Sequence, residues 1–258
     1  MKLVILAGGF GTRMSETTNL IPKPMSEIGN KPILWHIMKL YSHYGINEFI
    51  ICCGYKQYVI KEYFANYVRH NSDLTVDLSN NSIEVLDNEN SENWKITMID
   101  TDLETMTGGR IKRIQDYVGD ETFCLTYGDG VGDIDIAKTI ELHNNAGKIL
   151  SMTTYQPTGK LGVIDINEDG VVKSFKEKPE DSGSWINAGF FVCEPLIFKY
   201  LNGDHEMFEQ EPMQRLIAEN QVTTYKHRGF WMPMDTLRDN KVLNKLWDDN
   251  KADWKTWK

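Results

Sequence analysis

The sequence predicts an α/β fold, built on a doubly wound, mostly parallel sheet with an antiparallel β addition. Short runs of almost entirely apolar residues recur along the chain, as expected of strands that are buried on both faces of a sheet. Segments with apolar residues at helical spacing alternate with these runs, which implies right-handed crossovers and helices on both faces. At residues 74–78 and 83–86, polar and apolar residues alternate instead, which is typical of an antiparallel hairpin.

The first half of the chain begins with a strand at residues 2–7, an apolar run that ends at two glycines. Asn30 is expected to cap the first helix, with Pro32 near the helix start and Gly45 at its end. The other elements expected in this half are a strand at 48–53, a helix at 57–68, the hairpin of 74–78 and 83–86, a loop at 87–93, a strand at 94–99 and a helix at 109–118.

The second half continues with a buried strand at 122–126, which ends at the sequence Tyr-Gly-Asp-Gly. The turn Asn-Glu-Asp-Gly at 167–170 is expected to join two antiparallel strands. The remaining expected elements are a helix at 134–145, strands at 149–155, 163–166, 171–175 and 186–193, and helices near 196–201, 211–219 and 241–249. Because no linker-like composition or internal repeat divides the chain, we expect a single domain over residues 1–258.

The composition is that of a globular protein with an acidic balance. The chain has 258 residues, a formal net charge of −9 and a sequence pI of about 5.2. A nucleic-acid partner is therefore not expected, since binding to phosphate backbones normally requires a basic excess. An acidic protein that binds a small anion must instead gather a few cations and backbone N–H groups locally.

No apolar stretch approaches the roughly 20 residues of a membrane span, so no membrane contact is expected. The four cysteines, Cys52, Cys53, Cys124 and Cys193, lie inside apolar runs without metal-ligand spacing. We expect buried free thiols, which fits a reducing cytoplasm. His36 is expected to be packed rather than catalytic, and no Ser-His-Asp arrangement is readable.

A glycine-rich loop follows the first strand, with the sequence Leu-Ala-Gly-Gly-Phe-Gly-Thr-Arg at residues 6–13. Glycines there let the backbone approach a ligand, and free N–H groups can hold phosphate oxygens. The loop is not a P-loop, which needs Gly-Lys-Ser/Thr at its end. A dinucleotide fingerprint would need a third glycine where Met14 stands. Arg13 offers a bidentate fork to phosphate, although a glycine turn without a ligand stays open as an alternative.

Three further positions attract attention on chemical grounds. Lys23 lies between two prolines, which restrain the backbone of a Lys that suits a developing phosphoryl charge. Asp129 follows a buried strand in a turn flanked by glycines, where open parallel sheets bind ligands and where a carboxylate could hold Mg²⁺. Asp235 taken alone could equally be a helix cap. The nearby Asp133 and Asp135 do not match a calcium loop, and we expect a solvated helix start there.

Taken together, these motifs resemble the signature of the sugar nucleotidyltransferase (nucleoside-diphosphate-sugar pyrophosphorylase) family, and the resemblance covers essentially the whole chain. Its motifs are the glycine loop, Pro-Lys-Pro at 22–24, Tyr-Gly-Asp-Gly at 127–130, Glu-Lys-Pro at 177–179, Asn-Ala-Gly-Phe-Phe at 187–191 and Trp-Met-Pro-Met-Asp-Thr at 231–236. Four further stretches resemble the cytidylyltransferase branch: residues 50–56, 106–110, 235–239 and 254–257.

The resemblance implies a Rossmann-like sheet, Mg²⁺ as cofactor, and CTP and a sugar 1-phosphate as substrates. Arg13, Lys23 and Asp129 would be catalytic, and Asp129 and Asp235 would hold the metal. The implied nucleotide-binding residues are Leu6, Ala7, Gly8, Gly9, Gly11, Thr12, Arg13, Lys23, Thr107, Gly109, Arg110 and Gly128, of which Gly109 and Arg110 would contact cytosine. The implied sugar-phosphate-binding residues are Tyr127, Glu177, Lys178, Asn187 and Gly189.

The implied reaction is transfer of a cytidylyl group from CTP to α-D-glucose 1-phosphate, which yields CDP-glucose and pyrophosphate. Residues 160–164 depart from the branch pattern on the acceptor side, so another acceptor stays open, as does another nucleoside triphosphate. A non-catalytic nucleotide-sugar sensor on the same fold is the alternative from a different class. The resemblance also implies a homo-oligomer, plausibly a hexamer.

Overall fold

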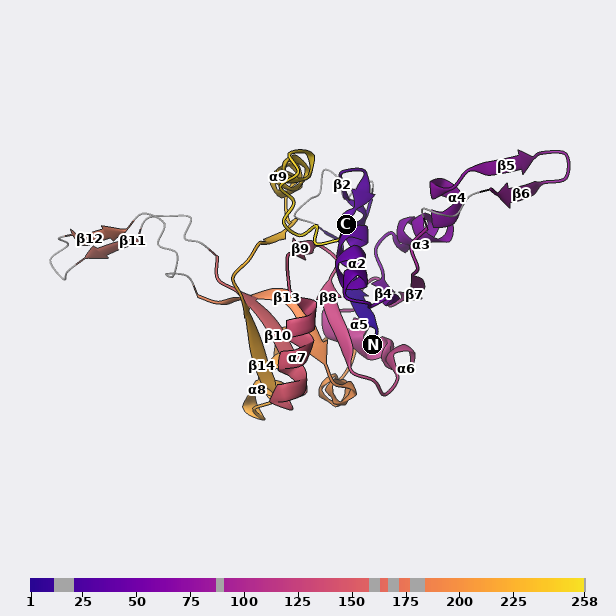
Figure 1. Ribbon diagram of the computed structural model, residues 1–258. Helices are drawn as coiled ribbons and strands as arrows, with labels where there is room; N and C mark the ends of the chain where they lie inside the picture. The colour runs from indigo at the N-terminus through magenta and orange to yellow at the C-terminus, as the bar shows by residue number, and fades with distance from the viewer. Residues whose placement is uncertain (12–20, 87–90, 158–162, 167–171, 177–183, 258) are drawn as a thin grey trace.

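The computed structural model describes residues 1–11, 21–86, 91–157, 163–166, 172–176 and 184–257. Within these ranges, seven strands form one sheet in the order β14-β10-β13-β8-β1-β4-β7 (Figure 1). Their bounds are β1 Leu3–Leu6, β4 Glu48–Cys53, β7 Lys95–Asp100, β8 Phe123–Tyr127, β10 Leu150–Tyr155, β13 Ile186–Cys193 and β14 Val222–His227. β13 runs antiparallel to β8 and β10, and the other neighbouring pairs are parallel. The predicted doubly wound, mostly parallel α/β fold is confirmed.

Helices cover both faces of this sheet because the strand side chains alternate between two buried clusters. Val4 and Leu6 face a cluster built with α5, α6, η3 and α8, whereas Leu3 and Ile5 face one built with α2, α3, α7 and α9. The helix bounds are η2 Lys23–Met25, α2 Ile33–His43, α3 Gln57–Ala65, α4 Tyr67–Asn71, α5 Thr107–Arg113, α6 Gln115–Val118, α7 Ile136–Ala146, η3 Pro195–Tyr200, α8 Glu211–Ala218 and α9 Leu237–Asp248. All four cysteines are buried and free, as predicted.

Four small antiparallel pairs lie outside the main sheet. They are β2 Glu27–Ile28 with β3 Lys31–Pro32, β5 Leu74–Asp77 with β6 Ser82–Val85, β9 Gly130–Gly132 with β15 Trp231–Pro233, and β11 Val163–Ile166 with β12 Val172–Lys176. The pairs β5–β6 and β11–β12 extend from opposite sides of the body (Figure 1). The β5–β6 pair is the one predicted from alternation, and the β11–β12 pair is the one predicted from the turn sequence at 167–170. The β9–β15 pair joins two segments that lie next to predicted site residues.

Some expected boundaries are wrong. Asn30 does not cap a helix: Gly29 and Asn30 have φ values of +57° and +66° and form the turn between β2 and β3, and α2 begins after Pro32. The helix expected at 57–68 is two helices separated at Asn66, and the segment near 196–201 is a 3₁₀ helix. Strand β14 was not predicted at all. Among the described residues, no helix is both long and apolar enough to cross a bilayer.

His36 lies at the centre of an aromatic cluster between α2 and the C-terminal segment. Its side chain is fully buried, and its Nε2 lies 2.8 Å from the carbonyl oxygen of Ile28. The indole of Trp254 donates to Nδ1 at 3.4 Å, which leaves Nε2 as the protonated nitrogen of a neutral ring. Burial lowers the pKa of His36 to about 4, because a charged imidazolium would be cut off from water and would turn an N–H toward the indole donor.

This shift predicts a loss of stability in mild acid. The unfolded state binds a proton near pH 6.5 and the folded state only near pH 4, so the free energy of unfolding falls as the pH drops through that window. The loss attributable to His36 should approach about 3 kcal/mol. Urea unfolding at pH 7 and pH 4.5 measures it. His36→Gln should reduce the change in the free energy of unfolding between pH 7 and pH 4.5, whereas His70→Gln, at an exposed position, should leave that change as it is in the wild type. The same change in all three proteins would contradict the assignment to His36.

Candidate active site

A cavity of about 410 Å³ opens at the carboxyl ends of β1 and β8. Because neighbouring parallel strands end at the same edge, loops that are far apart in sequence meet there. The predicted site residues that line this cavity are Leu6, Ala7, Gly8, Gly9, Gly11, Lys23, Thr107, Arg110, Tyr127, Gly128, Asp129 and Asp235. Residues 103–106 and Met207 also line this cavity, and the sequence analysis did not predict them as site residues.

Lys23 joins the two carboxylates that were predicted to hold a metal. Its Nζ lies 2.6 Å from Oδ2 of Asp129 and 2.7 Å from Oδ1 of Asp235. Burial lowers the pKa of Lys23, but the charges and hydrogen bonds of Asp129 and Asp235 outweigh burial and leave the pKa above its ordinary value. The ammonium therefore stays charged, and a cation already stands between the two carboxylates.

This arrangement fits a magnesium ion chemically. Two carboxylate oxygens converge on one positively charged atom, and such hard oxygen donors are what Mg²⁺ takes from proteins when substrate phosphates supply further ligands. Among the residues that the structure describes, no group of three or more His, Cys, Asp or Glu side chains forms a more extensive metal site. Asp235 is not the helix cap that it could have been, because Thr236, with Asp239, caps α9.

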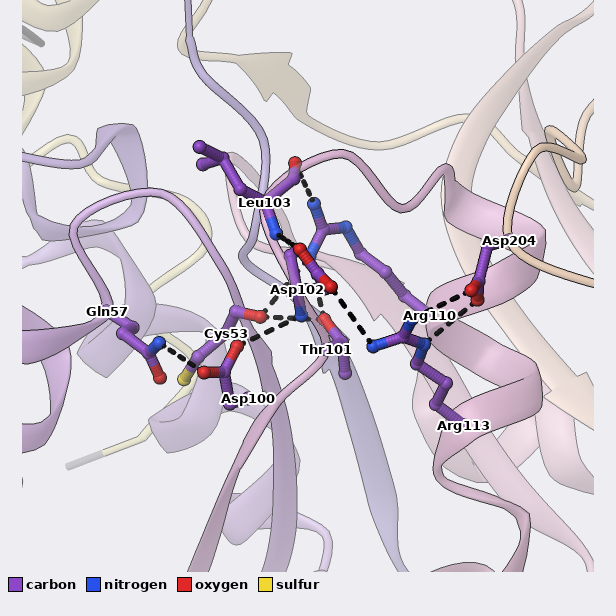
Figure 2. Close-up of polar contacts among 9 residues, drawn as sticks. All are labelled: Cys53, Gln57, Asp100, Thr101, Asp102, Leu103, Arg110, Arg113 and Asp204. Carbon is purple, nitrogen blue, oxygen red and sulfur yellow. Dashed lines mark hydrogen bonds and ion pairs between the residues drawn. The ribbon is translucent and has the colours of Figure 1, made fainter.

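Arg110 lines the cavity but directs its guanidinium into the protein (Figure 2). Its Nη1 donates to the carbonyl oxygens of Cys53 and Asp102 and to Oγ1 of Thr101, at 2.7 to 3.2 Å. Its Nη2 donates to the carbonyl oxygens of Gly8 and Leu103, each at 3.1 Å. The side chain thus ties the glycine loop to the ends of β4 and β7, and a direct contact with a base would have to replace one of these bonds.

Gly8 is required by this contact. A Cβ at Gly8 would lie 2.1 Å from Nη1 of Arg110, and one at Gly54 would lie 2.6 Å from the same atom. Gly109 has a different role: it does not line the cavity, and a Cβ there would lie 2.5 Å from the Cα of Asp204, so its small size lets α5 pack closely.

A second cavity of about 340 Å³ adjoins the first, and Tyr127, Asp129 and Asp235 line both. Asn187 and Gly189 line it as well, and Oδ1 of Asn187 accepts the backbone N–H of Gly189 at 2.8 Å. The predicted sugar-phosphate residues Tyr127, Asn187 and Gly189 are therefore brought together. The two cavities, one lined by the predicted nucleotide-binding residues and the other by these residues, share Asp129 and Asp235.

Glu209 lines neither cavity but holds two residues that do, Thr107 and Tyr127, and the sequence analysis did not predict it. Its carboxylate accepts hydrogen bonds from the hydroxyl of Tyr127 and, at 2.7 Å, from Oγ1 of Thr107. Burial raises the pKa of Tyr127, and the charge of Glu209 adds to the rise, so the phenol stays protonated and donates. No motif marks this glutamate in the sequence, because its partners lie about 80 and 100 positions away.

Two minor expectations can also be compared with the structure. Asp135 is the N-cap of α7, as expected of a helix start, and accepts the backbone N–H of Lys138. Asp133 lies 3.1 Å from Nε2 of His227 and so is not simply solvated. The predicted residues Thr12, Arg13, Glu177 and Lys178, and most of the departing stretch 160–164, lie outside the described residues.

Comparison with known proteins agrees with this geometry. The chain is 53% identical over its full length, and that of the relative, to glucose-1-phosphate cytidylyltransferase of Salmonella typhi. It is 46% identical over the full length of both chains to a probable glucose-1-phosphate cytidylyltransferase of Bacillus subtilis. A solved structure of a putative glucose-1-phosphate thymidylyltransferase from Bacillus anthracis has the same fold, with a TM-score of 0.71, 18% identity, and coverage of 100% of this chain and 98% of that one. The sequence pattern of the nucleotidyl transferase family matches residues 2–249, and the chain belongs to that family.

Proposed function

We propose that the protein transfers a cytidylyl group from CTP to α-D-glucose 1-phosphate, which gives CDP-glucose and pyrophosphate. The observation that carries this proposal is the bridge of Lys23, Asp129 and Asp235 at the junction of two cavities. A nucleotidyl transfer needs two phosphate-bearing substrates to meet at fixed positive charge, and the junction offers that arrangement. The names of the full-length relatives support CTP and glucose 1-phosphate as the pair of substrates.

The reaction needs no general base, because a phosphate oxygen of the sugar phosphate is already an anion at neutral pH. That oxygen attacks the α-phosphorus of CTP, and the bond to the bridging oxygen of the β-phosphate breaks in line, which releases pyrophosphate. Lys23 would neutralise the α-phosphate and Arg13 the leaving pyrophosphate. Asp129 and Asp235 would hold Mg²⁺, which supplies charge neutralisation to both substrates when it is bound.

The larger cavity is the proposed nucleotide site. Gly8, Gly9 and Gly11, together with Thr12 and Gly128, would lie against the nucleotide. Leu6, Ala7 and Thr107 contribute further wall. Of the two residues assigned to cytosine, Gly109 and Arg110, the geometry favours an indirect role, since Arg110 holds the carbonyl of Gly8 in place.

The smaller cavity is the proposed acceptor site. Tyr127, Asn187 and Gly189 line it, and the roles proposed for Glu177 and Lys178 are to bind a sugar hydroxyl and the sugar phosphate. The alternatives are another nucleoside triphosphate such as UTP or dTTP, or another phosphorylated acceptor. The proposed site of action is the cytoplasm, which agrees with four free thiols.

A matrix of four nucleoside triphosphates against several sugar 1-phosphates, assayed for pyrophosphate release, tests the proposal. We expect the CTP and glucose 1-phosphate pair to give a kcat/KM well above that of every other pair. A higher value for another nucleotide or acceptor would reassign the substrate. Binding of CDP-glucose without release of pyrophosphate from any pair would identify a sensor.

We further propose that the protein assembles as a homo-oligomer, with a hexamer as the expected form, in which the β5–β6 hairpin contacts a second copy. The register pairs Leu74 with Val85 and Val76 with Ile83, so these apolar side chains share one face of the hairpin. Val76 and Ile83 are 53% and 46% exposed, which is costly for an apolar face that stays in water.

Val76→Glu is therefore expected to lower the molar mass of the assembly by at least half in sedimentation velocity at micromolar concentration. The physical reason is the cost of burying an unpaired carboxylate in an apolar contact. Thr75→Glu is the matched control, because Thr75 is also exposed but points to the opposite face. The same mass for both variants would argue against the hairpin as a contact.

A further inference from the structure

The position of the Lys23 ammonium has a consequence for the order in which ligands enter. Nζ of Lys23 lies within 2.7 Å of an oxygen of both carboxylates, so it stands where a cation shared by Asp129 and Asp235 would stand. The Lys23 side chain is only 11% exposed, whereas each carboxylate side chain is 34% exposed. The two acids are thus open to the cavities, while the ammonium is enclosed between them.

The backbone around Lys23 holds this arrangement. Lys23 and Pro24 begin a buried 3₁₀ turn in which the N–H of Met25 donates to the carbonyl of Pro22 at 2.8 Å and that of Ser26 to the carbonyl of Lys23 at 3.0 Å. Prolines at both neighbouring positions restrict φ and ψ further. Any displacement of the ammonium therefore belongs to its four-carbon side chain and not to the loop.

Charge counting shows how the ammonium conflicts with a metal. Two carboxylates alone present a charge of about −2, one ammonium between them reduces it to about −1, and a divalent ion added beside the ammonium would also be repelled by it across a few ångströms. The conflict disappears when a triphosphate arrives, because its oxygens offer the ammonium a new partner and offer the metal further ligands.

We propose that Lys23 acts as an internal counter-ion that excludes divalent metal from Asp129 and Asp235 until nucleotide phosphates draw the ammonium away. This inference rests on the proposed function, since it assigns the metal to the same carboxylate pair. Metal and nucleotide then bind with positive coupling, and the coupling is reciprocal: each raises the affinity for the other.

Binding of Mn²⁺ to the nucleotide-free protein, followed through the EPR signal of the free ion, tests the proposal. Lys23→Met removes the charge and keeps the length of the side chain. This variant should bind Mn²⁺ at least about tenfold more tightly than the wild type. Mn²⁺ should also raise the melting temperature of the variant more than that of the wild type. Lys23→Gln, which keeps a polar group, should show the same gain in Mn²⁺ affinity. It replaces Lys23→Met in the experiment if the methionine variant folds poorly.

Two further variants make the result specific. Lys39→Met removes another ammonium from a carboxylate partner, Glu92, outside both cavities, and should bind Mn²⁺ as the wild type does. Adding Asp129→Asn to Lys23→Met should abolish the gained affinity. Equal affinities of the wild type and both Lys23 variants, or a gain that survives Asp129→Asn, would overturn the proposal. Turnover of the wild type with CTP and Mg²⁺ is measured in parallel, so that an active enzyme with no gain in Mn²⁺ affinity rejects this inference alone.

Discussion

Asp129→Asn is expected to lower kcat by about 10³-fold, which corresponds to about 4 kcal/mol of transition-state stabilisation. Asp129 lies two residues after the end of β8 and lines both cavities, and its Oδ2 is one of the two oxygens that converge on Lys23. The amide has almost the same shape but carries no charge, so it cannot compensate a metal or restrain the ammonium in the same way. Pyrophosphate release at saturating CTP, glucose 1-phosphate and Mg²⁺ measures the effect.

Asp135→Asn is the matched control for this experiment. Asp135 caps α7 and lines neither of the two cavities described, and Asn is as good an N-cap as Asp. Both its kcat and its melting temperature should stay close to those of the wild type. If Asp129→Asn kept more than about a tenth of normal turnover while folding normally, the carboxylate pair would not be the metal site.

Arg110→Met should lower the free energy of unfolding by about 4 kcal/mol, the larger of the two stability effects that the structure predicts. The Arg110 residue is 4% exposed, and its terminal nitrogens satisfy the carbonyl oxygens of Cys53, Asp102, Leu103 and Gly8. Methionine fills part of the volume but removes all of these donors, and among the described residues only the carbonyls of Cys53 and Gly8 keep a second one, from Thr101 and Tyr55. Urea unfolding measures the loss, and KM for the nucleotide should rise because the Gly8 carbonyl loses one of its two donors.

Arg113→Met tests whether the loss comes from burial or merely from a missing arginine. Arg113 lies on the same helix, its side chain is 36% exposed, and it forms an ion pair with Asp204 at 2.7 Å (Figure 2). Such a pair contributes at most about 1 kcal/mol, so this variant should remain near the wild type. Equal losses for Arg110→Met and Arg113→Met would refute a special role for the buried guanidinium. A loss confined to Arg110→Met supports it.

The sheet was largely predictable because strands that are buried on both faces have continuous apolar sequences. Strand β14 escaped prediction because Val-Thr-Thr-Tyr-Lys-His at 222–227 is half polar, and the reason is visible in its position at the edge of the sheet, beside β10 alone among the described strands. The turn at Asn30 was misread because Asn suits both an N-cap and a left-handed turn, and only the pairing of Ile28 with Lys31 decides between them.

The site was predictable where chemistry and loop position coincide, as at Lys23 and Asp129. It was not predictable where distant segments supply the partners. The resemblance implied that Arg110 contacts cytosine, yet its guanidinium donates to the carbonyl of Cys53 in β4 and to that of Gly8 in the glycine loop. Ser151, His143 and Glu194 likewise form a hydrogen-bonded set that no spacing reveals. Ser151 and His143 are 0% and 2% exposed, so this set is packed structure and offers no access to a substrate.

The docking of α9 on the β2–β3 hairpin bears on how the protein matures during synthesis. Asn240 and Asn244 donate to the carbonyl of Glu27, and Asn244 accepts the N–H of Gly29, so the segment after Lys23 is fastened to the segment after Asp235. Those two residues are 212 positions apart. A chain still emerging from the ribosome can therefore pair β1 with β4 and β8 while it lacks the second carboxylate. Asp235 and α9 thus join the site only after the segments that carry β1, β4 and β8 have been synthesised.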